Sequence, residues 1–145
     1  MGSAIVGAAG ALAGLNTVEA RPAKPKTKQP PNRIAVSTYS FWRFKENMKL
    51  PIDTCIDEAA RMGFDGVDLL LYQMESEDNS YLQKIKRHAL INGLDLCCMS
   101  THQGFVSPDK EKRQKNIDLT LRQIETAYRL GVPIVRLNTG RWGTS

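Results

Sequence analysis

The sequence predicts an α/β fold built from a repeated strand–helix unit, with about four parallel strands and three helices. A helical run that ends at a glycine and is followed by a short apolar strand occurs three times, at Gly63, Gly93 and Gly131. The repeat length fits one helix, one strand and their loops. Parallel strands need crossover connections of this kind, so the repeat predicts a parallel sheet covered by helices.

The composition describes one soluble domain of ordinary size, with 145 residues of which 41% are hydrophobic and 24% charged. A net charge of +5 would suit a nucleic-acid partner only if the basic residues gathered on the folded part. Residues 1–33 carry five basic side chains and one acidic, which leaves 15 basic and 14 acidic in the remainder. The folded part is nearly neutral, and we expect no nucleic-acid partner.

Residues 1–20 are typical of a secretory signal peptide. The small apolar run at residues 3–15 is shorter than the ~20 residues that a bilayer span needs, and Val18 and Ala20 suit the positions before a cleavage point. The positively charged start of such signals is missing, because only Met1 and Gly2 precede the run. We expect no stable membrane span and export to the periplasm or the exterior, with a cytoplasmic location as the alternative.

Residues 21–33 hold four prolines among lysines and arginines, which predicts an extended linker. The folded part, residues 34–145, should begin with a strand at 34–37. The aromatic loop after this strand either walls a ligand pocket or covers the end of the sheet. Pro51 suits the first turn of a helix. The predicted buried face of that helix consists of Ile52, Cys55, Ile56, Ala59 and Ala60.

The later units follow the same plan. We expect strands at 67–71, 94–99 and 134–137, a second helix that begins at Asn79 or Ser80, and a third and longest helix opened by Ser107, Pro108 and Asp109. The predicted apolar stripe of the second helix is Tyr81, Leu82, Ile85, Ala89 and Leu90. That of the third helix is Ile117, Leu121, Ile124 and Tyr128.

Two architectures fit four strands and three helices. One is a small doubly wound domain of ~110 residues, and the other is the first half of an eight-unit (β/α)8 barrel, which needs ~250 residues. A finished domain usually covers its last strand with a helix, whereas this sequence stops in a loop after residue 137. We therefore expect the N-terminal half of a barrel.

Three stretches, residues 63–69, 100–102 and 131–137, together resemble the xylose isomerase-like TIM barrels, the sugar phosphate isomerase/epimerase group. The resemblance covers residues 34–145. It implies a TIM barrel and isomerisation or epimerisation of a small-molecule sugar or keto-sugar by proton transfer next to a carbonyl. It also implies a divalent metal, commonly Mn²⁺, Mg²⁺, Co²⁺ or Zn²⁺, held by strands that come after Ser145, so no metal ligand is expected within this chain.

The candidate substrate-binding residues lie at the carboxyl ends of the predicted strands, where barrel enzymes place their chemistry. Asp68 lies in an apolar strand, where an unpaired carboxylate is costly, so either a pocket role or a structural hydrogen bond is expected. The resembled family more often has Glu at this position. His102 follows the third strand and matches a strand-end histidine that faces the substrate in that family.

Arg136 and Asn138 alternate on the fourth strand and should point to one face. Arg136 either binds a phosphate or carboxylate group or pairs with Asp68 across the barrel mouth. Trp142 is a candidate for stacking on a sugar ring. His88 is expected in the outer layer, and the three cysteines at 55, 97 and 98 are expected to be buried small residues rather than a disulfide framework.

The predicted function is therefore that of a metal-dependent sugar isomerase or epimerase, inactive as this half alone, with the catalytic residues unidentified. The alternatives are a non-catalytic carbohydrate-binding module or vestigial barrel and, less favoured because the folded part is nearly neutral, an abasic-site endonuclease. The sequence leaves the substrate, the metal, the stereochemistry and the oligomeric state open.

Overall fold

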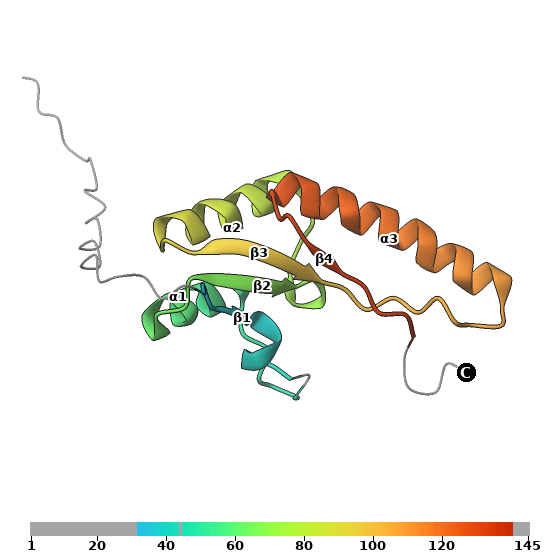
Figure 1. The fold of residues 1–145 in the computed structure, drawn as a ribbon, viewed down its shortest axis with the longest axis horizontal. Helices are drawn as coiled ribbons and strands as arrows, with labels where there is room; N and C mark the ends of the chain where they lie inside the picture. The colour runs from blue at the N-terminus through green and yellow to red at the C-terminus, as the bar shows by residue number, and fades with distance from the viewer. Residues whose placement is uncertain (1–31, 44, 141–145) are drawn as a thin grey trace, which may run out of the picture.

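The computed structural model describes residues 32–43 and 45–140 (Figure 1). The predicted signal segment, almost all of the predicted linker, and Trp142 lie outside these residues. At the start of the described chain, Arg33 forms an ion pair with Asp95 and donates to the backbone carbonyl of Asp65.

Within the described residues, four parallel strands form one sheet, and a helix follows each of the first three (Figure 1). The strands are β1 (Ala35–Ser37), β2 (Gly66–Leu70), β3 (Asp95–Ser100) and β4 (Val135–Arg136). The α-helices are α1 (Ile52–Met62), α2 (Asn79–Ile91) and α3 (Lys110–Leu130). Two short 3₁₀ helices, η1 (Thr38–Phe41) and η2 (Leu71–Gln73), follow β1 and β2. The predicted number, order and type of the main elements are confirmed.

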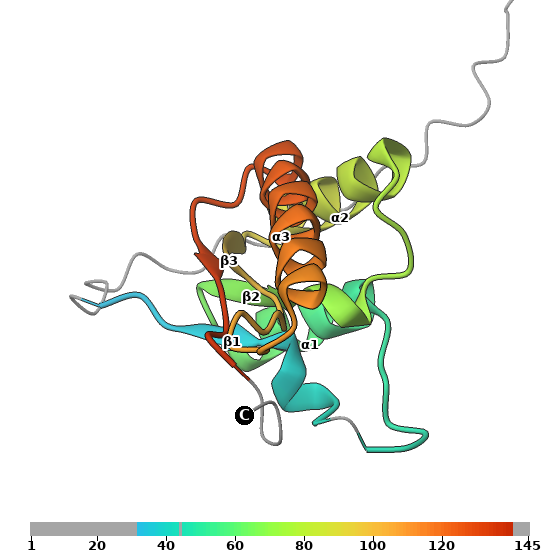
Figure 2. The same ribbon diagram turned by 90° about the vertical axis from the view of Figure 1, so that its right-hand side faces the viewer.

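The strand order β1-β2-β3-β4 decides between the two architectures. In a sequential order every crossover moves in the same direction, so right-handed crossovers place all the helices on one face of the sheet. A doubly wound sheet would instead reverse its order at a switch point and cover both faces. Figure 2 shows α1, α2 and α3 following one another around one side of the strands. The predicted barrel-type half is confirmed, and the doubly wound alternative is wrong.

The hydrophobic core lies between the sheet and this helix layer. Val67 and Leu69 of β2 and Met99 of β3 are fully buried there. Their helical partners include the whole predicted face of α1, whose members Ile52, Cys55, Ile56, Ala59 and Ala60 are all buried. The intervening strand residues, such as Asp68 and Ser100, therefore point to the opposite face, which is the inner face of a barrel.

The predicted stripe of α3 is wrong. Its four members are exposed, with Ile117 at 42%, Leu121 at 62%, Ile124 at 45% and Tyr128 at 79%. The buried residues of this helix are instead Thr120, Gln123, Thr126, Ala127 and Leu130.

The polar members of this buried set have hydrogen-bond partners, which offset the free-energy cost of burying polar groups. Gln123 accepts from the amide of Gln103, and the Thr126 hydroxyl donates to Glu77 Oε2 at 2.6 Å. Hydropathy alone assigns such residues to the surface. Leu90 of α2, also predicted to be buried, is 77% exposed.

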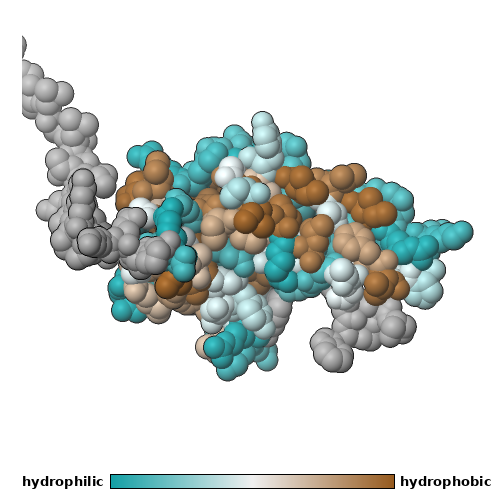
Figure 3. All heavy atoms as spheres, viewed as in Figure 1, coloured by the Kyte–Doolittle hydropathy of each residue, from teal (hydrophilic) through white to brown (hydrophobic). Residues whose placement is uncertain are grey.

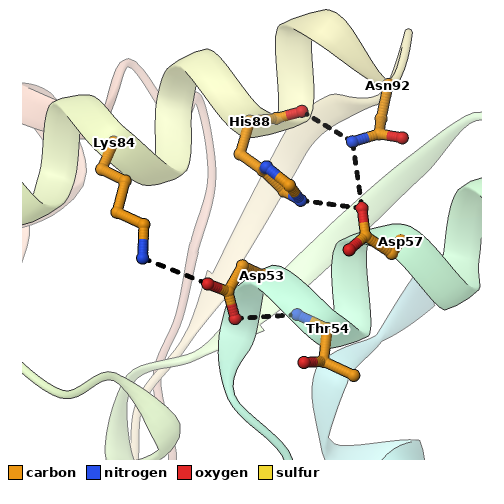
Figure 4. A network of polar contacts seen from close by, with 6 residues as sticks. All are labelled: Asp53, Thr54, Asp57, Lys84, His88 and Asn92. Atoms are coloured by element: carbon orange, nitrogen blue, oxygen red, sulfur yellow. Dashed lines mark hydrogen bonds and ion pairs between the residues drawn. The ribbon is translucent and has the colours of Figure 1, made fainter.

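A polar network joins α1 to α2 on the outside of the molecule (Figure 4). His88 Nε2 lies 2.8 Å from Asp57 Oδ1, which also accepts from Asn92 Nδ2 at 3.2 Å. Lys84 donates to Asp53 at 3.1 Å. His88 thus lies in the outer layer as expected, where it links two helices. No helix within the described ranges is long and apolar enough to cross a membrane.

Candidate functional site

Asp68 lies at the centre of a polar line on the inner face of the sheet. Its two carboxylate oxygens lie 2.8 Å and 2.7 Å from Ser100 Oγ, which donates to them. Ser100 is buried, and Asp68 is half-buried. The carboxylate in this apolar strand therefore has the hydrogen-bond partner that its burial requires.

Arg136 extends the same line on the neighbouring strand. Its Nε donates to Ser100 Oγ at 2.9 Å, and its Nη1 donates to Asn138 Oδ1 at 2.7 Å. The predicted shared face of Arg136 and Asn138 agrees with this contact. Arg136 and Asp68 are linked through the Ser100 hydroxyl rather than by a direct ion pair. The hydroxyl accepts from the guanidinium and donates to the carboxylate.

Arg136 is exposed. The reason is that β4 is an edge strand in the described sheet, with β3 as its hydrogen-bonded neighbour. The guanidinium therefore lies on an open inner face, next to a buried serine and a half-buried carboxylate.

His102 lies just after β3, two residues from Ser100. Its ring centroid is 5.5 Å from that of Tyr72, which follows β2 in η2, and the two rings are tilted by 54°. Thr101, the preceding residue, donates through both its backbone N–H and its hydroxyl to the carbonyl oxygen of Arg136, at 3.1 Å and 2.9 Å. His102 is thus held at the carboxyl ends of the strands, on the same edge of the sheet as Arg136.

Of the five candidate residues, four are described. Asp68, Arg136 and Asn138 belong to one hydrogen-bonded line, and His102 lies at the same end of the strands. Ser100 and Tyr72 were not predicted. Ser100 shares a face with Asp68 because a register shift between Val67 and Asp68 pairs Asp68 with Cys98. The sequence gives no sign of that shift.

The Cys98 thiol shares the inner face with Asp68. Burial, followed by the nearby negative charge of Asp68 and a hydrogen bond to it, raises the pKa of Cys98 to about 11. The group is therefore a neutral thiol at physiological pH. In this state it acts as a weak donor toward the carboxylate.

Comparison with known proteins identifies the fold family. Residues 56–145 match the family described as "Xylose isomerase-like TIM barrel". This match covers more than half of the chain. The chain belongs to this family. No curated protein matches the chain in sequence.

Two solved structures share the fold of this family member at low sequence identity. One is a D-psicose 3-epimerase determined in the presence of D-fructose, with a TM-score of 0.62, 16% identity, and coverage of 79% of this chain and 40% of that chain. The other is a fusion protein of a xylose isomerase-like TIM barrel and 4-hydroxyphenylpyruvate dioxygenase, with a TM-score of 0.57, 17% identity, and coverage of 79% and 18%. The matched part of the chain thus spans less than half the length of either structure.

Xylose isomerase-like barrels typically depend on a metal, but the described residues do not form a centre for one. Within residues 32–43 and 45–140, no three His, Cys, Asp or Glu side chains gather in a way that could hold an ion. On the inner face, Asp68 accepts hydrogen bonds from the Ser100 hydroxyl and the Cys98 thiol. The contacts of the polar line are hydrogen bonds between its own side chains.

A cavity of about 660 Å³ lies at the other end of the strands. It is lined by Leu94 and the start of β3, by the C-terminal end of α3 with Gly131, and by residues of α2 that include the buried Ala89. Its lining is mainly apolar and includes none of the candidate residues. The cavity is therefore separate from the polar line.

Proposed function

We propose that this chain supplies part of the substrate-binding face of a sugar isomerase or epimerase that acts by proton transfer next to a carbonyl. The observation that carries the proposal is the line Asp68–Ser100–Arg136–Asn138, at the carboxyl ends of parallel strands in a xylose isomerase-like barrel. Barrel enzymes place their active sites at this end. The epimerase with the same fold was solved with D-fructose, which makes a ketohexose the first substrate to test.

The chemistry of the line suits a polyhydroxylated ligand. A sugar hydroxyl both donates and accepts, and the line offers a carboxylate acceptor, a guanidinium donor and an amide that can do both. Asp68 would accept from a hydroxyl, and Arg136 would donate to a hydroxyl or carbonyl oxygen. In this proposal His102 and Tyr72 bound the side of the ligand, where an aromatic face can cover a sugar ring.

Proton transfer needs an acid/base pair that flanks the reacting carbon. We assign no such pair here and propose only binding and orientation for the four inner-face residues. A divalent metal, if the complete protein uses one, would be held by residues other than these.

The test is binding of D-fructose to the chain, measured by saturation-transfer NMR, with exchange of carbon-bound hydrogen for solvent deuterium as the readout of catalysis. We expect Asp68→Asn and Arg136→Gln each to weaken binding, whereas Asp57→Asn on the outer layer leaves it unchanged. Binding without deuterium exchange, in a protein extended to a full barrel and supplied with Mn²⁺, would favour the non-catalytic alternative. Equal binding by all variants would refute the assigned site.

A further inference from the structure

The cavity of about 660 Å³ at the amino-terminal ends of the strands, here called the base cavity, has no part in the proposed function. Its apolar lining includes Ala89, Leu90, Leu94, Leu96 and Leu130. Leu90, in the last turn of α2, is 77% exposed. Figure 3 shows exposed apolar side chains at the C-terminal end of α2, as well as along α3. Apolar surface that gathers around a hollow in this way marks a binding site.

The base cavity exists because α3 ends beside the first half of α2 (Figure 1). The Thr126 hydroxyl donates to Glu77, which precedes α2, and Lys86 Nζ donates to the carbonyl oxygen of Arg129 at 3.2 Å. Beyond this point β4 pairs with β3 only from Met99 onward. Within the described residues, the last turn of α2 and the first half of β3 are therefore left uncovered by α3 and β4.

The part of the chain that precedes the described residues joins them at the rim of this cavity. Asp95, at the start of β3, lines the cavity and forms an ion pair with Arg33. Arg33 also donates to the backbone carbonyl of Asp65 at 3.1 Å, and the backbone N–H of Ile34 donates to the Asp65 carboxylate at 3.0 Å. These contacts attach residues 1–31 beside the base cavity.

The sequence supplies an apolar segment within reach of this point. After one serine, residues 3–15 consist only of alanine, glycine, valine, isoleucine and leucine. Transfer of such side chains from water to an apolar cavity is favourable, by roughly 25 cal/mol for each Å² buried. Residues 16–32 connect the segment to Arg33, and a chain of this length spans between about 20 Å when flexible and about 50 Å when extended. The segment can therefore fold back into the cavity beside which it is attached.

We propose that residues 3–15 dock in the base cavity of the same chain for as long as they remain attached to it. The linker holds the segment at an effective concentration on the order of millimolar, so docking within one chain prevails over docking between two copies in dilute solution. Cleavage after Ala20, which is expected for a signal peptide, would vacate the cavity. The inference does not depend on the proposed function.

The experiment uses the 145-residue chain with ¹³C-labelled methyl groups and measures nuclear Overhauser contacts by NMR. We expect contacts between the methyl groups of residues 3–15 and those of Leu90 and Leu94 in the base cavity. The double variant Leu12→Asp with Leu15→Asp places two charges in the apolar segment, and burying them would be costly. This variant should lose the contacts and shift the methyl resonances of Leu90 and Leu94.

Matched variants separate docking from a general effect of charge. Thr27→Asp with Gln29→Asp makes the same charge change in the linker and should leave the contacts in place. On the cavity side, Leu90→Lys should abolish them, whereas Leu121→Lys, at an exposed leucine of α3 outside the cavity lining, should not. Leu90 and Leu121 are both exposed, so these variants should keep the circular dichroism of the parent.

A sample that mixes labelled with unlabelled chains distinguishes docking within one chain from docking between copies. We expect the contacts only within the labelled chain, and we expect them to be unchanged on dilution. The proposal is overturned if residues 3–15 make no contact with the base cavity, if the contacts join two chains, or if Leu12→Asp with Leu15→Asp leaves them in place. It is also overturned if the cavity methyl groups contact a bound small molecule instead.

Discussion

At the scale of single residues, the Ser100 hydroxyl is the central contact of the inner face. It has one proton, which it donates to Asp68, so its oxygen accepts from Arg136 with a lone pair. The hydroxyl thus connects the guanidinium of Arg136 to the carboxylate of Asp68 through two hydrogen bonds. Removing it leaves a half-buried carboxylate without its main donor.

We therefore expect Ser100→Ala to lower the free energy of unfolding by about 1–3 kcal/mol at pH 7, the usual cost of an unsatisfied buried partner. Urea denaturation monitored by circular dichroism measures this change. Ser100→Thr keeps the hydroxyl and a side chain suited to a strand, and should recover part of the loss. A loss equal in the two variants would show that packing, rather than the hydroxyl, is responsible.

The thiol of Cys98 reports on the charge of Asp68. Burial and then the charge and hydrogen bond of Asp68 raise the pKa of Cys98 to about 11, so Asp68→Asn should lower that pKa. The pH dependence of alkylation by iodoacetamide, followed at each cysteine by peptide mass spectrometry, measures the shift. Cys55, whose pKa of about 11 results mainly from burial, serves as the internal control and should not respond. If the pH dependence of Cys98 alkylation is unchanged in Asp68→Asn, the charge of Asp68 does not raise the pKa of this thiol.

At the scale of elements, α3 depends on its N-terminal cap. The carboxylate of Asp109 accepts from the backbone N–H groups of Lys112 at 3.3 Å and Glu111 at 2.9 Å. These hydrogen bonds hold the pKa of Asp109 below its usual value of 3.8. A lowered carboxyl pKa contributes stability above the unfolded-state value, and this contribution is lost as the pH falls through the folded-state value.

We expect the protein to be more stable than its Asp109→Asn variant above about pH 5, with the difference shrinking below the usual carboxyl pKa as the native cap becomes protonated. Asparagine still caps a helix but carries no charge. Thermal unfolding at several pH values measures the difference. If it stays constant from pH 7 to pH 3, the charge of Asp109 does not contribute to the cap.

The start of β2 has no room for a side chain at Gly66. A Cβ at this position would lie 2.9 Å from the backbone carbonyl oxygen of Asp95 on β3. Gly66→Ala should therefore destabilise the protein by about 1–3 kcal/mol, because a backbone atom must move. Gly104→Ala is the matched control, since nothing lies within 4 Å of the added atom there. Denaturant midpoints compare the two, and equal midpoints would contradict the steric argument.

Much of the element pattern could be predicted from the sequence because local rules govern it. Glycines 63 and 131 adopt left-handed conformations with φ of 89° and 74°, as their positions after apolar runs indicated. The buried face of α1 followed from helical spacing alone. The orientation of α3 could not be predicted in this way, because its buried polar residues depend on partners such as Gln103 and Glu77 that are distant in sequence.

The candidate site was predicted less completely. Asp68, Arg136 and Asn138 could be placed on strands by their position, but their link through Ser100 depends on a register shift in β2 and β3 that no local pattern encodes. Tyr72 could not be predicted, because its contact with His102 depends on how the two loops lie in space. Trp142 lies outside the described residues, and its stacking role stays a prediction.

At the scale of the whole molecule, the strands differ in how many neighbours they have. β2 and β3 each pair on both sides, whereas β1 and β4 form the edges of the described sheet. We expect the backbone amides of Val67 and Leu69 to exchange with deuterium most slowly and those of β1 and β4 fastest, because local opening is easiest where few contacts must break. Hydrogen exchange followed by NMR measures this order. Slow exchange in β4 of the isolated chain would show that something covers this edge.

The sequential strand order also bears on how the chain folds during synthesis. Each new strand pairs with the one made immediately before it, as Val67 does with Val36 and Leu96 does with Val67. These partners lie only ~30 residues apart, so each closure costs little chain entropy. Because synthesis starts at the N-terminus, each strand after β1 is made when the strand it pairs with already exists. At each stage of synthesis, the most recently made strand is the open edge to which the next strand can be added.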